Sequence, residues 1–249
     1  GAVENLEFKS NPRFLDEIFY PPNLLPKSVV WFAPIRTKPK RTYDGFGRTF
    51  SPEGEHTPYL LRKILEGKGK SKIAHAIQEF GKESGLFKSV AIKNLGSAAA
   101  SPFELRVELM PKYPLSISSV GYGLSQVLPL IAEMLTRPKE SWFAIQQPEV
   151  HLHPKAQAAL GDLIFELAER EEKGFLIETH SDFTIDRFRL KFKRKPAHKT
   201  TAQVLFFERD QSGNRVTPLE LSADGEYPAD QPESFRDFFL KEQMSLLDI

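Results

Sequence analysis

Two short apolar segments on either side of a long amphipathic stretch constrain the fold of this 249-residue chain most strongly. Residues 142–145 and 174–178 are typical of buried strands, and 154–170 between them is typical of a helix with proline in its first turn. A third apolar segment, 28–33, also predicts a buried strand. Strands that alternate with long helices predict an α/β fold built on a parallel sheet.

The rest of the chain divides into shorter predicted elements. With 40% apolar residues, the chain can bury a substantial core. We predict helices at 58–65, 73–83, 123–135 (bent at Pro129) and 184–194, a half-exposed strand at 103–110, a hairpin of 202–208 with 215–221, an irregular stretch at 11–26 and a short helix at the end of the tail. These elements suggest one main domain, 1–210, followed by a small α+β module, 211–249.

Bulk composition excludes several classes of protein. A formal net charge of +1 gives no global field for binding nucleic acid. The absence of cysteine excludes disulfides and thiolate metal sites and agrees with a cytoplasmic location. The sequence has no apolar run of membrane-spanning length and no secretory signal at its start. Because it does not begin with Met, we expect it to be part of a longer chain.

Three polar motifs accompany the predicted strands. Residues 118–126 read Ser-Ser-Val-Gly-Tyr-Gly-Leu-Ser-Gln, 146–154 read Gln-Gln-Pro-Glu-Val-His-Leu-His-Pro, and 178–181 read Glu-Thr-His-Ser. Ligands of parallel α/β sheets bind at the carboxyl ends of the strands. Gln146 and His180 both follow such ends, so we expect them in one site.

In this order and spacing, the motifs resemble those of ATP-cassette-like ATPases related to the OLD (overcoming lysogenisation defect) and SMC-type proteins. The similarity is to the branch that ends in a short C-terminal module rather than a TOPRIM nuclease, and it extends over 29–249, more weakly before 118. The resemblance implies a P-loop NTPase-like core of the ABC head type. The motifs then correspond to a signature loop, a Walker B strand with its D-loop, and a switch histidine.

The phosphate loop of such a head is missing from the sequence. No G-x-x-x-x-G-K-[ST] motif occurs. Gly69-Lys70-Ser71 ends like one, but Ile64 stands where the first glycine is required, and a helix rather than a strand precedes it. We interpret 66–72 as a solvated connection and expect the N-terminal, phosphate-binding portion of the head to be absent.

The resemblance assigns nucleotide-binding roles to the first motif. In cassette heads this loop contacts the γ-phosphate of ATP held by the opposite subunit, where the start of a helix attracts anions. The implied residues are Ser119, Gly121, Gly123, Ser125 and Gln126. Ser119 and Gly121 form the Ser-x-Gly kernel, and Gly121 and Gly123 would let the backbone approach the phosphate. Taken alone, the motif also fits a glycine-containing turn that starts a helix.

The second motif departs from the usual pattern of catalytic residues. Cassette ATPases end the Walker B strand in two acids, one ordering the Mg²⁺ water shell and one polarising the attacking water. Here these positions are Gln146 and Gln147. Gln146 could hold Mg²⁺ only weakly, through water, and neither glutamine can accept a proton. Glu149 could replace the base or could merely cap the following turn, and the sequence favours neither alternative.

The histidines carry further candidate roles. His151 and His153 lie in the D-loop, where a structural or cross-dimer role is favoured over metal binding because no third ligand has suitable spacing. His180 corresponds to the switch histidine that would donate a hydrogen bond to the γ-phosphate. Alternatively, His180 caps the helix that starts at 181.

Two clusters of basic residues remain. Arg36, Lys38, Lys40 and Arg41 follow the first strand, and six cations lie in 187–195. Such runs are usually solvated, and DNA binding is the open alternative. Arg36 stands in a Pro-Ile-Arg sequence that resembles a recurrent family element, so it is a candidate contact for phosphate or a partner subunit.

The sequence therefore predicts an ATP-binding head that uses Mg²⁺ and acts as a nucleotide-dependent dimerisation switch in DNA repair or anti-phage defence. Its expected partners are a second copy or a paired ATPase head, with a nuclease as a candidate effector. The alternative is a non-catalytic subunit that supplies a signature face to a partner. Without a phosphate loop, this chain alone is expected to be inactive.

Overall fold

The computed structural model describes residues 29–44, 46–67, 72–98, 100–110, 113–211, 213–232, 234–235 and 244. The predicted irregular stretch at 11–26 and the Gly69-Lys70-Ser71 segment lie outside the described residues. So does almost all of the predicted helix at the end of the tail.

The central sheet, sheet A, is parallel. It consists of β1 (Val29–Phe32), β5 (Trp142–Gln146) and β6 (Gly174–Glu178) in the order β1-β5-β6. Both strand pairs run parallel, and Gln146 at the end of β5 lies opposite Glu178 at the end of β6. The predicted α/β class and the parallel sheet are confirmed.

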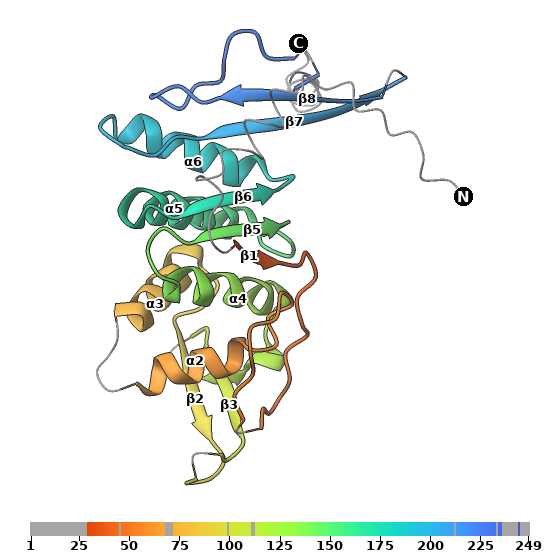
Figure 1. Ribbon diagram of the computed structural model, residues 1–249. Helices are drawn as coiled ribbons and strands as arrows, with labels where there is room; N and C mark the ends of the chain where they lie inside the picture. Colours follow the sequence, from red (N-terminus) through yellow and green to blue (C-terminus); the bar gives the residue numbers. More distant parts are fainter. Residues whose placement is uncertain are drawn as a thin grey trace.

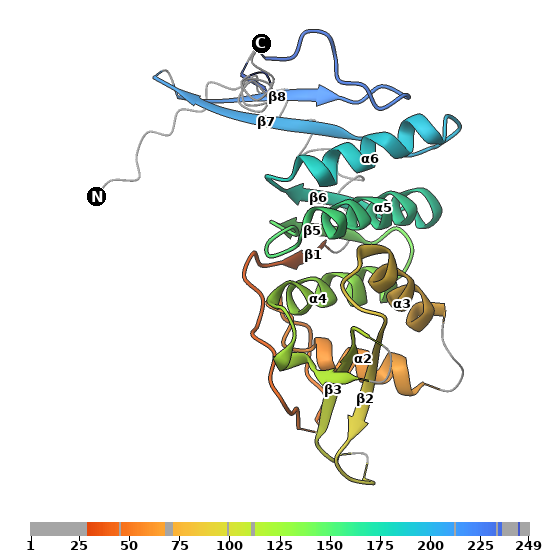
Figure 2. The same cartoon turned by 180° about the vertical axis from the view of Figure 1, so that it is seen from behind.

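Three helices of the second half of the chain lie near this sheet: α4 (Tyr122–Thr136), α5 (Pro154–Glu171) and α6 (Asp182–Arg194). Two opposite views place α5 beside β6 and on one side of the sheet (Figures 1 and 2). Two earlier helices, α2 (Thr57–Glu66) and α3 (Lys72–Ser84), pack near α4 on the other side of β1 from β5. All five helices were predicted, and α4 continues without interruption through Pro129.

The three strands predicted to be buried are so only in part: β1 and β5 bury alternate residues, and every residue of β6 is intermediate or exposed. Phe32, Phe143 and Ile145 are at most 2% exposed and belong to the main core. The alternating residues are open: Trp31 is 46% and Leu176 64% exposed. Parallel sheets are usually covered on both faces, but the described helices cover one face here.

A second, antiparallel sheet lies at the opposite end of the molecule from the C-terminal hairpin (Figure 1). It consists of β2 (Ser89–Asn94), β3 (Phe103–Glu108) and β4 (Pro114–Ser116), and a short 3-10 turn, Ile117–Ser119, leads from β4 towards α4. The predicted strand at 103–110 is β3, with Phe103, Leu105 and Val107 buried. Strands β2 and β4 were not predicted because neither carries a clear apolar periodicity, and β4 has only 3 residues.

The predicted C-terminal hairpin is also present. It pairs β7 (Gln203–Asp210) with β8 (Gly213–Glu220) in antiparallel register. Phe235 packs against Phe206 of this hairpin and against Tyr227, which follows β8. The division between 1–210 and 211–249 falls in the turn of this hairpin and stays a prediction.

Candidate functional site

The carboxyl ends of the three strands of sheet A gather most of the residues singled out from the sequence. Arg36 follows β1, Gln146 ends β5, and Glu178 ends β6 just before His180. Because parallel strands end at the same edge, these side chains come from distant parts of the chain to one place. The Nη2 of Arg36 donates to the carbonyl oxygen of Gln146 at 3.1 Å, which joins the ends of β1 and β5.

Arg36 also joins this edge to the signature helix. Its backbone N–H donates to Oε1 of Gln126 at 3.0 Å, and Nε2 of Gln126 donates back to the Arg36 carbonyl at 3.3 Å. Gln126 is 1% exposed, so its amide group serves this connection and does not reach the surface. The hydroxyl of Tyr122 makes a longer contact with the same carbonyl, at 3.4 Å. The first turns of α4 are thereby fixed to the end of β1.

The guanidinium of Arg36 is buried and incompletely paired. Arg36 is 1% exposed, and its Nε and Nη1 have no hydrogen-bond partner. Burial lowers the pKa of Arg36 to about 10, and the nearby charge of Glu149 acts in the opposite direction. Because the side chain is enclosed, the predicted contact of Arg36 with phosphate or a partner would require it to move. In its present position it links structural elements.

The signature loop places two of its five predicted residues at the surface. Ser119 and Gly121 are exposed, and a Cβ on Gly121 would meet no atom within 4 Å. Gly121 is the N-cap of α4, and no side chain caps this helix. An anion therefore has open access to Gly121 at the start of the helix, where the helix dipole favours negative charge.

The other signature residues face the interior. A Cβ on Gly123 would lie 2.3 Å from the carbonyl oxygen of His151, so this glycine allows close approach of the D-loop of its own chain. Ser125 is buried, and its hydroxyl donates to the carbonyl of Tyr122 at 2.7 Å. With Gln126 also buried, these three positions shape the loop from within.

At the end of the Walker B strand, both glutamines donate to a single carboxylate. Nε2 of Gln146 donates to Glu178 Oε2 at 3.0 Å, and Nε2 of Gln147 donates to Glu178 Oε1 at 3.4 Å. Gln147 has a positive φ of 43°, and its backbone N–H donates to the Glu178 carbonyl at 2.8 Å. The sequence reasoning gave Glu178 no role. The sequence does place this carboxylate directly before Thr179 and His180, at the end of a predicted strand.

Glu149 bridges the Walker B and switch segments. Its Oε1 accepts the backbone N–H of His180 at 2.7 Å, while the buried Oε2 has no partner. Glu149 thus binds across to the next strand end, a contact that neither open alternative, substitute base or cap of the following turn, had included.

His180 is exposed, and the cap of α6 is Ser181. The Ser181 hydroxyl accepts the backbone N–H of Thr184 at 3.1 Å and donates to Oε1 of Gln157 at 2.5 Å. The alternative in which His180 caps this helix is therefore wrong, because Ser181 caps it.

The D-loop histidines have separate surroundings. Nδ1 of His153 accepts the Ala156 N–H at 3.4 Å and caps α5, a structural role. His151 has a positive φ of 65°, and its ring meets Tyr122 edge-on at 5.0 Å between centroids. Among the residues that the structure describes, no group of three or more His, Asp or Glu side chains is placed to hold a metal ion.

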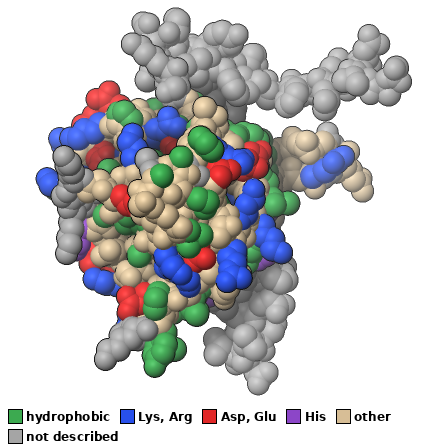
Figure 3. All heavy atoms as spheres, turned by 90° about the horizontal axis from the view of Figure 1, so that it is seen from below, with side chains coloured by type: hydrophobic (Ala, Val, Ile, Leu, Met, Phe, Trp, Pro, Cys, Tyr) green, Lys and Arg blue, Asp and Glu red, His purple; other side chains and the backbone are tan. Residues whose placement is uncertain are grey.

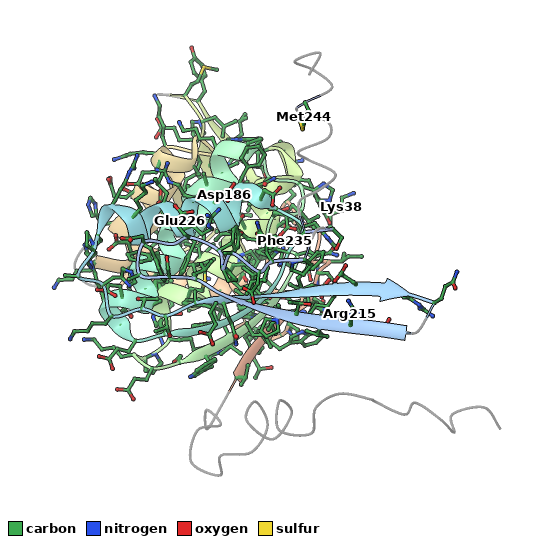
Figure 4. All side chains as sticks on the ribbon, turned by 90° about the horizontal axis from the view of Figure 1, so that it is seen from above. Lys38, Asp186, Arg215, Glu226, Phe235 and Met244 are labelled. Carbon is green, nitrogen blue, oxygen red and sulfur yellow. The ribbon has the colours of Figure 1, made fainter. Side chains whose placement is uncertain are left out.

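The two basic clusters differ sharply. In α6, Arg187 pairs with Asp162 at 2.9 Å and Arg189 reaches both Asp186 and Glu226, and Lys195 at the end of the helix pairs with Glu169 at 3.1 Å. Figure 4 labels these two carboxylates, Asp186 within α6 and Glu226 in the segment after β8. By contrast, the cations of the loop after β1 are exposed and form no ion pair within the described ranges: Lys38, Lys40 and Arg41. On the face seen in Figure 3, basic and acidic side chains are interspersed.

A cavity of about 130 Å³ lies away from the strand ends. The loop after β1, the start of α2 and the side of α4 line it, including Lys38, Thr57 and Ser125. None of the four predicted catalytic residues lines this cavity. One predicted nucleotide-binding residue, Ser125, does line it, so the cavity borders the signature helix from its inner side.

Comparison with known families gives one match. Residues 72–186 match the family model described as "AAA domain, putative AbiEii toxin, Type IV TA system". The matched part is less than half of the chain, and it includes the signature loop, the Walker B strand and His180. It supports a P-loop ATPase domain, which agrees with the α/β fold. A comparison with curated proteins finds no match.

Solved structures of SMC heads share this arrangement loosely. A structure from work on "ATP-driven dimerization and DNA stimulated activation of SMC ATPases" is 12% identical, with a TM-score of 0.47, over 74% of this chain and 96% of that one. A Pyrococcus furiosus Smc head with a coiled coil, bound to the C-terminal domain of ScpA, is 13% identical with a TM-score of 0.44, over 71% of this chain and 37% of that one. An SmcHead bound to the C-winged helix domain of ScpA is 14% identical with a TM-score of 0.46, over 67% and 46%. The chain thus spans less than half of the last two proteins. We therefore infer the roles of individual residues from the geometry of this chain alone.

ATP and Mg²⁺, which the ATPase family implies, can be tested against the residues at the strand ends. Carboxylate and amide oxygens are the ligands that Mg²⁺ prefers, and Glu178, Gln146 and Gln147 offer them. The exposed start of α4 suits a phosphate. No helix among the described residues is long and apolar enough to cross a membrane.

Proposed function

We propose that this chain is the signature, Walker B and switch part of an ATP-cassette-type head of the OLD/SMC-related kind. In this proposal it acts as a nucleotide-dependent dimerisation switch in DNA repair or anti-phage defence. The observation that carries the proposal is the convergence of Arg36, Gln146 and His180 at one edge of a parallel sheet, tied through Gln126 to the signature helix.

In the proposed assembly, two heads enclose ATP between them. Ser119 and Gly121 of one head approach the γ-phosphate of ATP bound to the other head. The open space at Gly121 supports this arrangement, since a bulkier residue would obstruct the phosphate. His180, exposed at the end of β6, donates a hydrogen bond that distinguishes ATP from ADP. ATP occupancy then sets the geometry of the dimer, and release or hydrolysis resets it.

Hydrolysis in this assembly is expected to be slow. Mg²⁺, when bound with ATP, would neutralise charge on the phosphates. Gln146 and Gln147 contribute amide oxygens but no charge and no proton acceptor. Replacing Gln147 with glutamate should therefore raise the turnover of the intact assembly. A wild-type turnover near the ordinary enzyme value of about 10 s⁻¹ would contradict this part of the proposal.

A second candidate function is a non-catalytic subunit that supplies a signature face to a partner ATPase or nuclease. Two observations favour it: the sequence contains no phosphate loop, and the amides of both glutamines are already committed to Glu178. Direct DNA binding, if it occurs, would use the unpaired cations of the loop after β1 rather than α6.

Nucleotide titration tests the main proposal. The 249-residue chain alone should bind ATP with a Kd weaker than about 10⁻⁴ M, because a phosphate loop normally dominates phosphate binding. The polypeptide translated from the intact gene should bind ATP tightly and dimerise with it if that polypeptide contains a phosphate loop. Micromolar binding by this chain alone would contradict the expected division of the site.

The signature assignment has its own test. Gly121→Asp places a carboxylate where the phosphate of the opposite head should approach, and like charges repel. The variant should fold normally, since nothing surrounds the position, but should lose ATP-driven dimerisation. Unchanged dimerisation in light scattering would show that the signature face lies elsewhere.

A further inference from the structure

The missing acids of the Walker B strand leave the site in need of a carboxylate. Glu149 and Glu178 are the two carboxylates in hydrogen-bond contact with the segments at this edge. Glu149 has one oxygen on the His180 N–H and the other buried. Glu178 is exposed and ends β6 directly opposite Gln146. Of the two, Glu178 is the carboxylate that an incoming ion can reach.

The contacts of Glu178 place its charge at the position of the absent acid. Its two oxygens accept from Gln146 at 3.0 Å and Gln147 at 3.4 Å. An amide that donates through Nε2 still has its Oε1 available as an acceptor. Each carboxylate oxygen likewise has a further lone pair. One charged and two neutral oxygen-bearing side chains are thus held together by hydrogen bonds across the ends of two adjacent strands.

We propose that Glu178 supplies the carboxylate that organises a divalent cation and its water shell at this edge, in place of the acid missing at Gln146. The proposal deepens the proposed nucleotide function and rests on it. Mg²⁺ and Mn²⁺ bind oxygen ligands and keep several waters, so one carboxylate assisted by amide oxygens is a sufficient anchor when phosphates supply the rest. The carboxylate that holds the cation then comes from β6, at the position directly opposite Gln146 in β5.

A purely structural role for Glu178 is the competing explanation. Its contacts with Gln147 fix a residue with positive φ, and this alone could account for the carboxylate. The two explanations differ in what happens when the charge is moved. Exchanging the residues, in Gln146→Glu/Glu178→Gln, keeps a glutamate and a glutamine opposite each other but shifts the charge to β5.

The test uses Mn²⁺ alone as a paramagnetic probe on the ¹⁵N-labelled chain. In the wild type, millimolar Mn²⁺ should broaden the amide signals of Gln146, Gln147, Glu149 and 178–180 more than those elsewhere. Glu178→Gln should reduce this local broadening at least fivefold, and the exchanged double variant should restore it. Glu220→Gln is the matched control, because Glu220 is an exposed glutamate at the end of another strand, β8, and should leave the broadening unchanged.

Three outcomes would overturn the proposal: no local broadening up to about 10 mM Mn²⁺, broadening that survives Glu178→Gln, or no recovery in the double variant. Circular dichroism melting of each variant confirms that the fold is kept. ATP titration of the intact polypeptide separates this proposal from the nucleotide function. If Mn²⁺ binding follows Glu178 but no nucleotide binds, the nucleotide function fails and the cation site stands.

Discussion

At the carboxyl edge of sheet A, buried polar atoms lack hydrogen-bond partners among the described residues, whereas the charges of the α5–α6 interface are paired: even Glu166 Oε2, which makes no hydrogen bond there, forms an ion pair with Arg170 at 2.9 Å. At the edge, two guanidinium nitrogens of Arg36 and one oxygen of Glu149 lack partners. At the interface, Asp162 and Glu169 each bind cations of or just after α6. Unpaired buried polar groups cost stability and persist where function requires them. The edge is therefore interpreted as a site and the interface as a structural connection.

The largest expected effect compares glycines in the two regions. A Cβ on Gly123 would lie 2.3 Å from the His151 carbonyl oxygen at the edge, and one on Gly161 would lie 2.7 Å from the Thr184 carbonyl oxygen at the interface. Both are helical, so alanine would otherwise gain about 1 kcal/mol from helix propensity. Gly123→Ala should instead destabilise by about 1–3 kcal/mol, and Gly161→Ala by somewhat less.

Gly121→Ala is the control, because its Cβ would meet no atom within 4 Å. It should change the free energy of unfolding by less than about 1 kcal/mol. Chemical denaturation of the three variants measures the differences. If Gly123→Ala proves no less stable than Gly121→Ala, the D-loop does not lie against α4 as described.

An effect of similar size is expected at the interface, and it depends on pH. Burial alone would raise the pKa of Glu169, but hydrogen bonds from Thr200, Lys195 and the backbone of 199–200 outweigh it and lower the pKa to about 2. A carboxyl with a lowered folded-state pKa stabilises the fold above its ordinary pKa of 4.5, and this contribution is lost as the pH falls towards 2.

Glu169→Gln should therefore lower stability at neutral pH, by about 1.5–3 kcal/mol for lost hydrogen bonds to a charged group. The difference between wild type and variant should shrink as the pH falls from about 4.5 to about 2. Thermal melting at several pH values measures it. A difference that stays constant over this range would mean that the carboxylate charge is not what matters.

The sequence was sufficient for the elements but not for the burial of individual residues. Periodicity located the helices and the strands of sheet A, because each carries an apolar face. It did not locate β2 or β4, which lack a clear apolar period, or reveal that the described helices cover only one face of sheet A. That required knowing which helices pack against it.

At the candidate site, too, the sequence predicted some features and missed others. The rule that parallel strands end at one edge was enough to predict from the sequence that Gln146 and His180 lie together. Glu178 stands in the third motif, but its contact with Gln146 across the sheet depends on the register of β5 and β6, which the motif does not give. The enclosed position of Arg36 could not be predicted, since an arginine after a strand is usually solvated.

A smaller effect on stability is expected where an arginine is replaced in each region. Arg36→Met removes a buried cation with two unpaired nitrogens, so its loss should change stability by less than about 1 kcal/mol in either direction. Arg187→Met breaks a partly exposed pair with Asp162 and should also cost only about 0–1 kcal/mol.

Function should separate these two variants. Because Arg36 connects β1 to the end of β5, Arg36→Met should impair ATP-driven dimerisation of the intact assembly, whereas Arg187→Met should leave it unchanged. Urea denaturation and light scattering, run on both variants, supply the two measurements. Equal dimerisation by both would mean that Arg36 has no part in the site.

The smallest expected effect on stability is at His180, and it contrasts with its neighbour Ser181. His180 is exposed and Ser181 caps α6, so His180→Ala should change the free energy of unfolding by less than about 0.5 kcal/mol, whereas Ser181→Ala should cost about 1 kcal/mol.

In the intact assembly, His180→Ala should alter the preference for ATP over ADP more than Ser181→Ala does. Losing one hydrogen bond to a charged phosphate costs about 1.5–3 kcal/mol, so His180→Ala should reduce the preference for ATP over ADP roughly ten- to a hundredfold while sparing ADP affinity. Paired melting and nucleotide-competition measurements on both variants test both expectations. Equal weakening of ATP and ADP by His180→Ala would mean that the end of β6 had moved, because a contact with the γ-phosphate alone cannot alter ADP binding.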